Sequence, residues 1–138
     1  MSMPRLDTDA AMSWQAPAIV RRYCSDFGRT PEDGAAGFQA FKQFMVVCAE
    51  SDGARAPSEA IDDIWHTALL FTRPYREFCS EALGAYIHHE PVEDRADTSV
   101  YALTRHEAQQ RFRTLDPRFR CSVDEVASCG GCASIYVP

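Results

Sequence analysis

The segment SEAIDDIWHTALLFTRPYREFCSEALG, residues 58–84, decides the fold because it predicts two consecutive helices. Ser58 is a favourable N-cap, and the first helix then shows an apolar stripe at helical spacing: Ile61, Ile64, Trp65 and Ala68. Thr72 and Pro74 restart the chain as a second helix that ends at Gly84. Its stripe is Tyr75, Phe78, Cys79 and Ala82. The short break predicts that the two helices are adjacent and antiparallel.

Helical periodicity continues on both sides of this segment. Upstream, residues 17–27 and 31–50 each predict a helix, and downstream residues 99–115 predict another. We expect residues 1–13 to be a flexible arm and residues 85–99 to be a polar loop. Residues 116–138 are expected to be an irregular tail containing Cys and Gly, which could end in a short strand over 134–137. The sequence therefore predicts an all-α fold, a single-domain bundle of about five helices spanning residues 1–138.

Composition limits the classes of partner. The 138 residues carry a formal net charge of −6, which argues against binding to nucleic acid or to an anionic membrane. No run approaches the roughly 20 apolar residues of a membrane span, and the N-terminus lacks the apolar segment of a signal peptide. We therefore expect a cytoplasmic chain with reduced cysteines, whose partner is an unknown protein or small molecule.

The six cysteines fall into two groups. Cys24, Cys48 and Cys79 lie on apolar helical stripes, where cysteine usually acts as a small buried hydrophobic residue. The other three, Cys121, Cys129 and Cys132, lie in the tail. Cys129 and Cys132 form a C-x-x-C motif that is common in zinc sites and in thiol redox sites, but supplies only half of a four-ligand set.

Three of the four histidines lie between residues 66 and 89. His66 lies off the apolar stripe of its helix, beside Asp62 and Asp63, so it is either a surface histidine or a functional one oriented by a carboxylate. His88 and His89 are adjacent in a segment that Pro91 keeps out of a helix. Because neighbouring side chains of an extended chain point in opposite directions, only one of the two should face the helix of His66.

Several of these residues together resemble a known family. Asp62 with Trp65-His66, then Thr72-x-x-Tyr75-x-x-Phe78-Cys79, Gly84 and His89-x-Pro91 are similar to the helical region of plant glycine-rich domain-containing proteins and their short bacterial relatives. The resemblance covers about residues 38–112. It implies that His66 and His89 matter more than His88 and His106, and that the C-terminal CGGC is a reduced version of the family's glycine- and cysteine-rich tails.

We expect His66 and His89 to converge on one metal site, which Cys129 and Cys132 would complete. Asp62 and Asp63 would lie in its second shell, with Asp62 holding the second ring nitrogen of His66, and Cys79 and His88 are reserve ligands. Thiolate and imidazole ligands favour zinc, with iron or copper as alternatives. Two other functions stay open: a metal-dependent enzyme in which His66 is the base and Asp62 orients it, and a metal-free interaction module. His106 is expected to be a surface residue.

Overall fold

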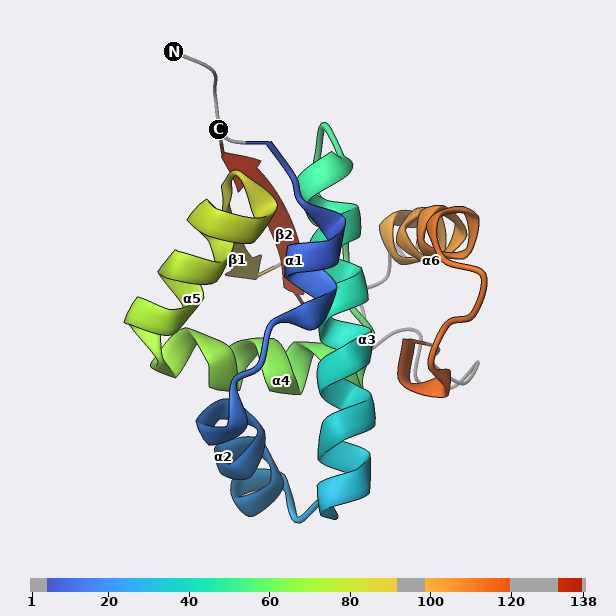
Figure 1. The fold of residues 1–138 in the computed structure, drawn as a ribbon. Helices are drawn as coiled ribbons and strands as arrows, with labels where there is room; N and C mark the ends of the chain where they lie inside the picture. The colour runs from blue at the N-terminus through green and yellow to red at the C-terminus, as the bar shows by residue number, and fades with distance from the viewer. Residues whose placement is uncertain (1–4, 92–98, 120–131, 138) are drawn as a thin grey trace.

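The central element of the structure is helix α3 (Pro31–Glu50). Its first turn is fixed by Thr30, whose hydroxyl accepts a hydrogen bond from the Asp33 amide, and by Pro31 at the first helical position. Every residue from Ala40 to Cys48 is buried, so α3 is covered on all sides by other elements. In Figure 1, α3 runs through the middle of the molecule and the remaining helices surround it.

The structure, a computed structural model, describes residues 5–91, 99–119 and 132–137. Besides α3 it contains these helices: α1 (Thr8–Ser13), α2 (Pro17–Phe27), α4 (Glu59–Leu70), α5 (Thr72–Phe78) and α6 (Ser99–Arg111). A π-helical turn, η1 (Cys79–Leu83), continues α5, and a 3₁₀ turn, η2 (Pro117–Phe119), follows α6. Two strands, β1 (Tyr86–Pro91) and β2 (Cys132–Val137), form an antiparallel pair. The fold is all-α, as predicted.

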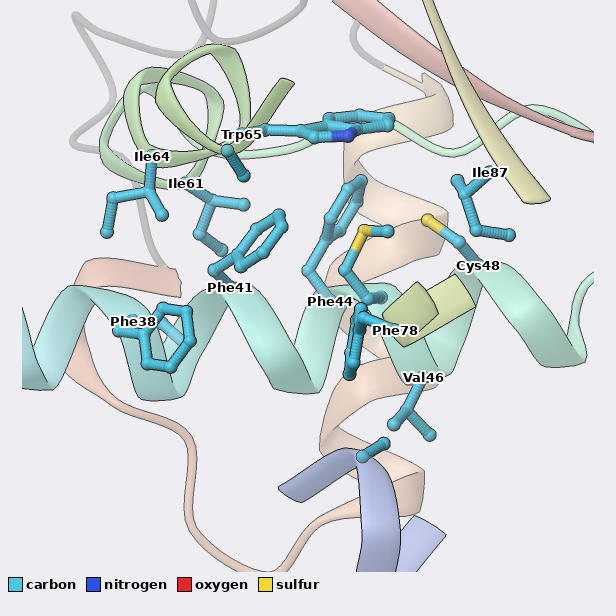
Figure 2. Packing of buried hydrophobic residues seen from close by; sticks show 14 of the residues in the cluster. Phe38, Phe41, Phe44, Val46, Cys48, Ile61, Ile64, Trp65, Phe78 and Ile87 are labelled. Carbon is cyan, nitrogen blue, oxygen red and sulfur yellow. The ribbon is translucent and has the colours of Figure 1, made fainter. Parts of the chain in front are cut away.

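The core forms where α3, α4 and α5 meet. Large apolar side chains from these helices and from β1 interleave in Figure 2, among them Phe41, Phe44, Trp65, Phe78 and Ile87. Phe44 and Trp65 meet edge to face with ring centroids 5.3 Å apart. Trp65 is fully buried, and its indole N–H donates a hydrogen bond of 3.0 Å to the Tyr75 hydroxyl. The apolar stripes predicted for residues 58–84 thus form the core of the domain.

The N-terminal segment differs from the expected flexible arm. The Asp7 side chain accepts a hydrogen bond from the Ala10 amide and so begins helix α1, in which Ala11 is fully buried. After α1, the Trp14 ring stacks on Phe78 at a centroid distance of 4.0 Å. The prediction for residues 5–13 was wrong, because this short helix is stabilised by packing onto distant residues and not by its own periodicity.

Lys42, on α3, secures the end of α1. Its side chain is 3% exposed, and its ammonium group donates hydrogen bonds to the backbone oxygens of Met12 (2.7 Å) and Trp14 (3.1 Å). Burial lowers the pKa of this lysine. The single lysine of the chain therefore satisfies carbonyl groups at the carboxyl end of α1 that the helix itself leaves unpaired.

Two further expectations are corrected. The predicted loop contains β1, because pairing with β2 supplies hydrogen bonds that the local sequence does not reveal. The predicted break between α4 and α5 is present at Phe71, but the helices are not antiparallel. In Figure 1, α4 crosses the view whereas α5 rises from its end, so the two form a corner. There are six α-helices in the described ranges, where about five were expected.

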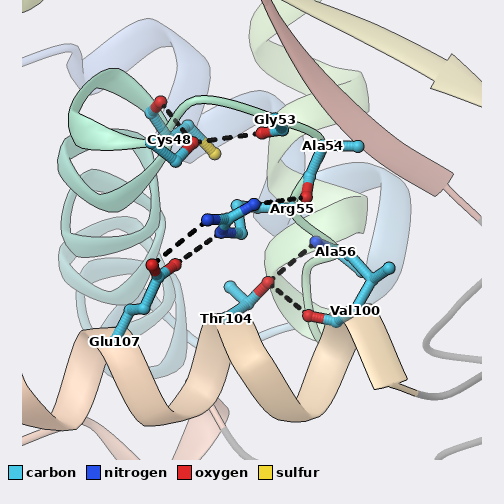
Figure 3. A network of polar contacts seen from close by, with 9 residues as sticks. Cys48, Gly53, Ala54, Arg55, Ala56, Val100, Thr104 and Glu107 are labelled. Carbon is cyan, nitrogen blue, oxygen red and sulfur yellow. Dashed lines mark hydrogen bonds and ion pairs between the residues drawn. The ribbon is translucent and has the colours of Figure 1, made fainter.

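Helix α6 makes several polar contacts with the rest of the molecule. Figure 3 shows the Arg55 guanidinium paired with both carboxylate oxygens of Glu107. One turn earlier, the Thr104 hydroxyl accepts a hydrogen bond from the Ala56 amide (3.0 Å) and donates one to the Val100 carbonyl (2.7 Å). These contacts connect α6 to the segment between α3 and α4. Among the described helices, none combines the length and the apolar character needed to cross a membrane.

Candidate metal centre

Helix α4 places Asp62 and His66 one turn apart. The Ser58 hydroxyl accepts a hydrogen bond from the Ile61 amide at the start of the helix, which fixes the helical register. Because Ile61, Ile64 and Trp65 are buried, the spacing of four residues leaves Asp62 and His66 together beside the buried stripe. Their side chains are 20% and 50% exposed, respectively.

Strand β1 brings His89 to the same place. Trp65 donates to the Tyr75 hydroxyl, which in turn donates to the backbone oxygen of Ile87, so a buried chain of hydrogen bonds ties β1 to α4 and α5. The His89 ring meets the Trp65 ring edge to face at 4.1 Å, and its side chain is only 6% exposed. The preceding residue, His88, is exposed, and its ring contacts Tyr86. The prediction that only one of the two histidines faces α4 is confirmed.

Asp62, His66 and His89 form the cluster at the centre of this region. The His89 Nε2 atom lies 2.7 Å from Asp62 Oδ1, and the His66 Nε2 atom lies 3.7 Å from the same oxygen. The two imidazole rings have centroids 4.4 Å apart. One ligand atom from each of the three residues falls within 4.8 Å of the others, so together they could hold a metal ion. The predicted convergence of His66 and His89 is confirmed.

The role expected for Asp62 is corrected by this geometry. We expected its carboxylate to hold the second ring nitrogen of His66, but its short contact is to His89. Asp62 therefore belongs to the three-residue cluster that could hold a metal ion. The sequence indicated that Asp62 and His66 lie together, since an acid and a histidine four residues apart lie on one helix face. The contact with His89, 27 residues away, required the fold.

Asp63 faces a different part of the molecule. Its carboxylate interacts electrostatically with Arg29 and with Tyr23 of α2, and it is not part of the three-residue cluster. Burial, followed by the nearby charges of Glu59 and Asp62, raises the pKa of Asp63 to about 6. The acidic side chains on this part of α4 thus repel one another, and a cation would relieve that repulsion.

Of the predicted cysteine ligands, the structure places only the thiol of Cys79, which lies outside the cluster. Cys79 is a buried thiol that interacts with Tyr75 and Ile87, outside the cluster, and burial raises its pKa to about 11. Cys132 begins β2, where its backbone pairs with Pro91, while His89 pairs with Ser134. Cys129 lies outside the described residues, as does Cys121. His106 is exposed on α6, as expected.

The core cysteines follow the prediction with one exception. Cys48 and Cys79 are 1% exposed, whereas Cys24 is only partly buried. Cys24 lies at the edge of α2, where its thiol donates to the Thr30 carbonyl at 3.4 Å. The expectation that Cys24 is buried was wrong, because α2 covers only one side of α3 and presents Ile19 and Tyr23 to the core.

Comparisons with known proteins identify one family. The sequence profile of the UCP032817-like family matches residues 20–115, a range that includes α3, α4, β1 and α6 and therefore all three residues of the cluster. Neither the curated proteins nor the solved structures contain a match. These findings do not bear on the resemblance to glycine-rich domain-containing proteins, which stays a prediction. Because the match covers well over half of the sequence, the chain belongs to the UCP032817-like family.

Proposed function

We propose that this protein binds a divalent transition metal through Asp62, His66 and His89. The observation that carries the proposal is the convergence of three ligand atoms within 4.8 Å, two from helix α4 and one from strand β1, although more than 20 residues separate His66 from His89 in the sequence. Two imidazoles and one carboxylate suit zinc, ferrous iron and copper better than calcium or magnesium, which prefer oxygen ligands. We name zinc as the first choice and iron or copper as alternatives.

Three protein ligands leave at least one coordination position for water or for a fourth side chain. Cys132 is our first choice for that ligand, because β2 pairs with the strand that carries His89. Cys129 would join it if both thiolates of the C-x-x-C motif bind. With a thiolate the site would be closed and structural, whereas with water it would be open. An open site suits a metal-dependent enzyme, in which the metal activates the bound water.

The metal content of the full, tag-free chain tests this proposal. After loading with zinc and removal of excess metal, we expect about one zinc per chain, measured by mass spectrometry of the elements. Asp62→Asn, His66→Ala and His89→Ala should each lose it, because changing even a residue that only orients a ligand costs about 10- to 100-fold in affinity, and these changes remove the ligands themselves. His88→Ala and His106→Ala are matched controls on exposed histidines and should retain it. Zinc bound equally by all five variants would contradict the assigned ligands.

Cobalt substitution then distinguishes a closed site from an open one. Co²⁺ at a site with a thiolate ligand gives a strong near-ultraviolet charge-transfer band, which the Cys129→Ser/Cys132→Ser double variant should remove. If the wild-type protein lacks that band, no thiolate binds the metal, and water completes the coordination by Asp62, His66 and His89. If the wild-type chain binds none of zinc, cobalt, iron and copper, the metal proposal is wrong, and the result favours the metal-free interaction module.

A further inference from the structure

A second site lies on the other side of β1 from the metal centre. A pocket of about 540 Å³, which we call the η1 pocket, is lined by Arg76 of α5, Cys79 and Ser80 of η1, Gly84, Ala85, and Tyr86 and His88 of β1. Its volume lies within the range of small-molecule sites. Because His88 and His89 are consecutive in a strand, they face opposite sides, which separates this pocket from the metal centre.

The walls of the η1 pocket are largely apolar. The buried residues Cys79 and Ala85 contribute its inner surface, and the Tyr86 ring lies along one side. Tyr86 is held from two directions, because its ring meets Tyr75 edge to face at 5.4 Å and His88 edge to face at 4.6 Å. A flat apolar group would therefore find a fixed aromatic surface here.

The described residues that line the pocket include a cation but no acid. Arg76 supplies a permanent cation and His88 an imidazole. Among residues 5–90 and 99–119, Arg76 has no ion-pair partner. The chain has a net charge of −6, but the described lining of this pocket contains an arginine and no acid. Such an arginine is suited to bind an anion from solution.

The backbone beside the pocket contains a π-helical turn, a feature often found at functional sites. The helix changes from α5 into the wider π-helical turn η1 and ends at Gly84, whose φ of 74° reverses the chain into β1. This change places Arg76, near the end of α5, opposite Tyr86 and His88 on the returning strand. Single π-helical turns occur frequently at functional sites.

We infer that the η1 pocket binds a small organic carboxylate with a flat apolar body. The carboxylate lies against Arg76 and His88, and the apolar body lies against Tyr86, Ala85 and Cys79. The guanidinium forms two parallel hydrogen bonds to the carboxylate, which an uncharged ligand cannot accept with the same strength. This site is independent of the metal centre and goes beyond the function proposed for it.

Titration of the full chain with benzoate, followed by amide resonances in NMR spectra, tests this site. Benzoate should shift the amides of Gly84, Ala85 and His88, and benzyl alcohol should bind at least about tenfold more weakly because it lacks the charge. Arg76→Gln should weaken benzoate binding by about tenfold or more. Arg73→Gln is the matched control, since Arg73 is exposed on the same helix and does not line this pocket.

The outcomes separate this site from its alternatives. Equal affinity of the Arg73→Gln and Arg76→Gln variants, or of benzoate and benzyl alcohol, would overturn the site. Inorganic phosphate that binds as tightly as benzoate would overturn the choice of an organic carboxylate. Benzoate should bind equally well to the His66→Ala variant, and loss of binding there would show that the carboxylate was held by a metal ion at the other centre. Failure to bind zinc leaves the expected result at this pocket unchanged.

Discussion

At the scale of single residues, the two histidines of the candidate metal centre lie in different environments. His89 is 6% exposed and packs against the buried Trp65, whereas the His66 side chain is 50% exposed. Both have a ring nitrogen directed at Asp62, yet only His89 approaches it at hydrogen-bond distance. His89 therefore has a structural role in addition to its proposed role as a ligand, and His66 completes the site from the solvent side.

Alanine substitutions should separate these two roles. In metal-free protein, His89→Ala should lower the free energy of unfolding by about 2 kcal/mol, because it removes packing on Trp65 and leaves the Asp62 carboxylate without its hydrogen bond. His66→Ala should lower it by less than about 0.5 kcal/mol. Urea unfolding with a chelator measures both values, and His106→Ala is the control. Equal losses for the two ligand variants would contradict the structural role of His89.

Thiol reactivity tests the burial of the cysteines. The pKa of Cys79 is raised to about 11 by burial, so at pH 8 only about one thiol in a thousand is ionised and reactive. Iodoacetamide at pH 8 should therefore leave Cys79 and the buried Cys48 unmodified, while the partly buried Cys24 reacts. Peptide mapping by mass spectrometry identifies the modified sites, and denatured protein is the control in which all six should react. Rapid native labelling of Cys79 would contradict its burial.

At the scale of elements, the contact between α2 and α3 depends on a glycine. A Cβ atom added to Gly34 would lie 2.4 Å from the Cys24 sulfur and 3.0 Å from Val20 Cγ1. Both distances are shorter than van der Waals contact, so α2 approaches α3 more closely than a side chain would permit. Gly34 is thus retained in a helix despite the lower helical propensity of glycine.

Gly34→Ala should consequently destabilise the protein by about 1–2 kcal/mol, although alanine is the better helix former. Thermal or urea unfolding measures the loss. Combining it with Cys24→Ala should recover most of the stability, since that change removes the sulfur that the new methyl group meets. Gly53→Ala is the matched control, because its added Cβ would come only within 3.7 Å of Arg55. Stabilisation by Gly34→Ala would show that the helices separate without cost.

At the scale of the whole molecule, α6 is joined to the rest by hydrogen bonds in addition to the apolar packing of Tyr101 and Ala108. Its contacts include the Arg55–Glu107 pair and the Thr104–Ala56 bond of Figure 3, and the Tyr101 hydroxyl donates to the Phe119 carbonyl at 3.2 Å. Beyond the helix, the Gln43 side-chain amide donates to the Thr114 carbonyl at 3.1 Å. The attachment of α6 should therefore respond to the loss of single polar groups.

A double-mutant cycle on Arg55→Met and Glu107→Gln should give a coupling energy of about 1 kcal/mol or more. The two side chains are 12% and 35% exposed, and two hydrogen bonds join them. The Arg22–Asp26 pair, with side chains 52% and 41% exposed, is the control and should give less than about 0.5 kcal/mol. Unfolding in low salt measures both cycles. Coupling no larger than in the control pair would contradict a structural role for the Arg55–Glu107 contact.

The sequence alone determined the features that depend on interactions within about one helical turn. Thr30 and Ser58 begin their helices, and Gly28 and Gly84 end theirs with positive φ angles of 64° and 74°. The apolar stripes predicted for residues 58–84 became core, since burial follows the same period as the helix. The separation of His88 from His89 followed from the geometry of an extended chain. Each of these features depends on residues that lie near one another in the sequence.

The tertiary structure alone decided which of these elements meet. The pairing of β1 with β2 and the anchoring of α1 by Lys42 depend on residues at least 28 positions apart. The burial of α3 from Ala40 to Cys48 likewise depends on contacts with other elements, such as that between Phe44 and Trp65. The contact between Asp62 and His89, which we did not expect from the sequence, also joins residues that are distant in the chain. Local patterns specify which face of a helix is apolar, but the choice of its neighbours follows from burial and hydrogen bonding over the whole chain.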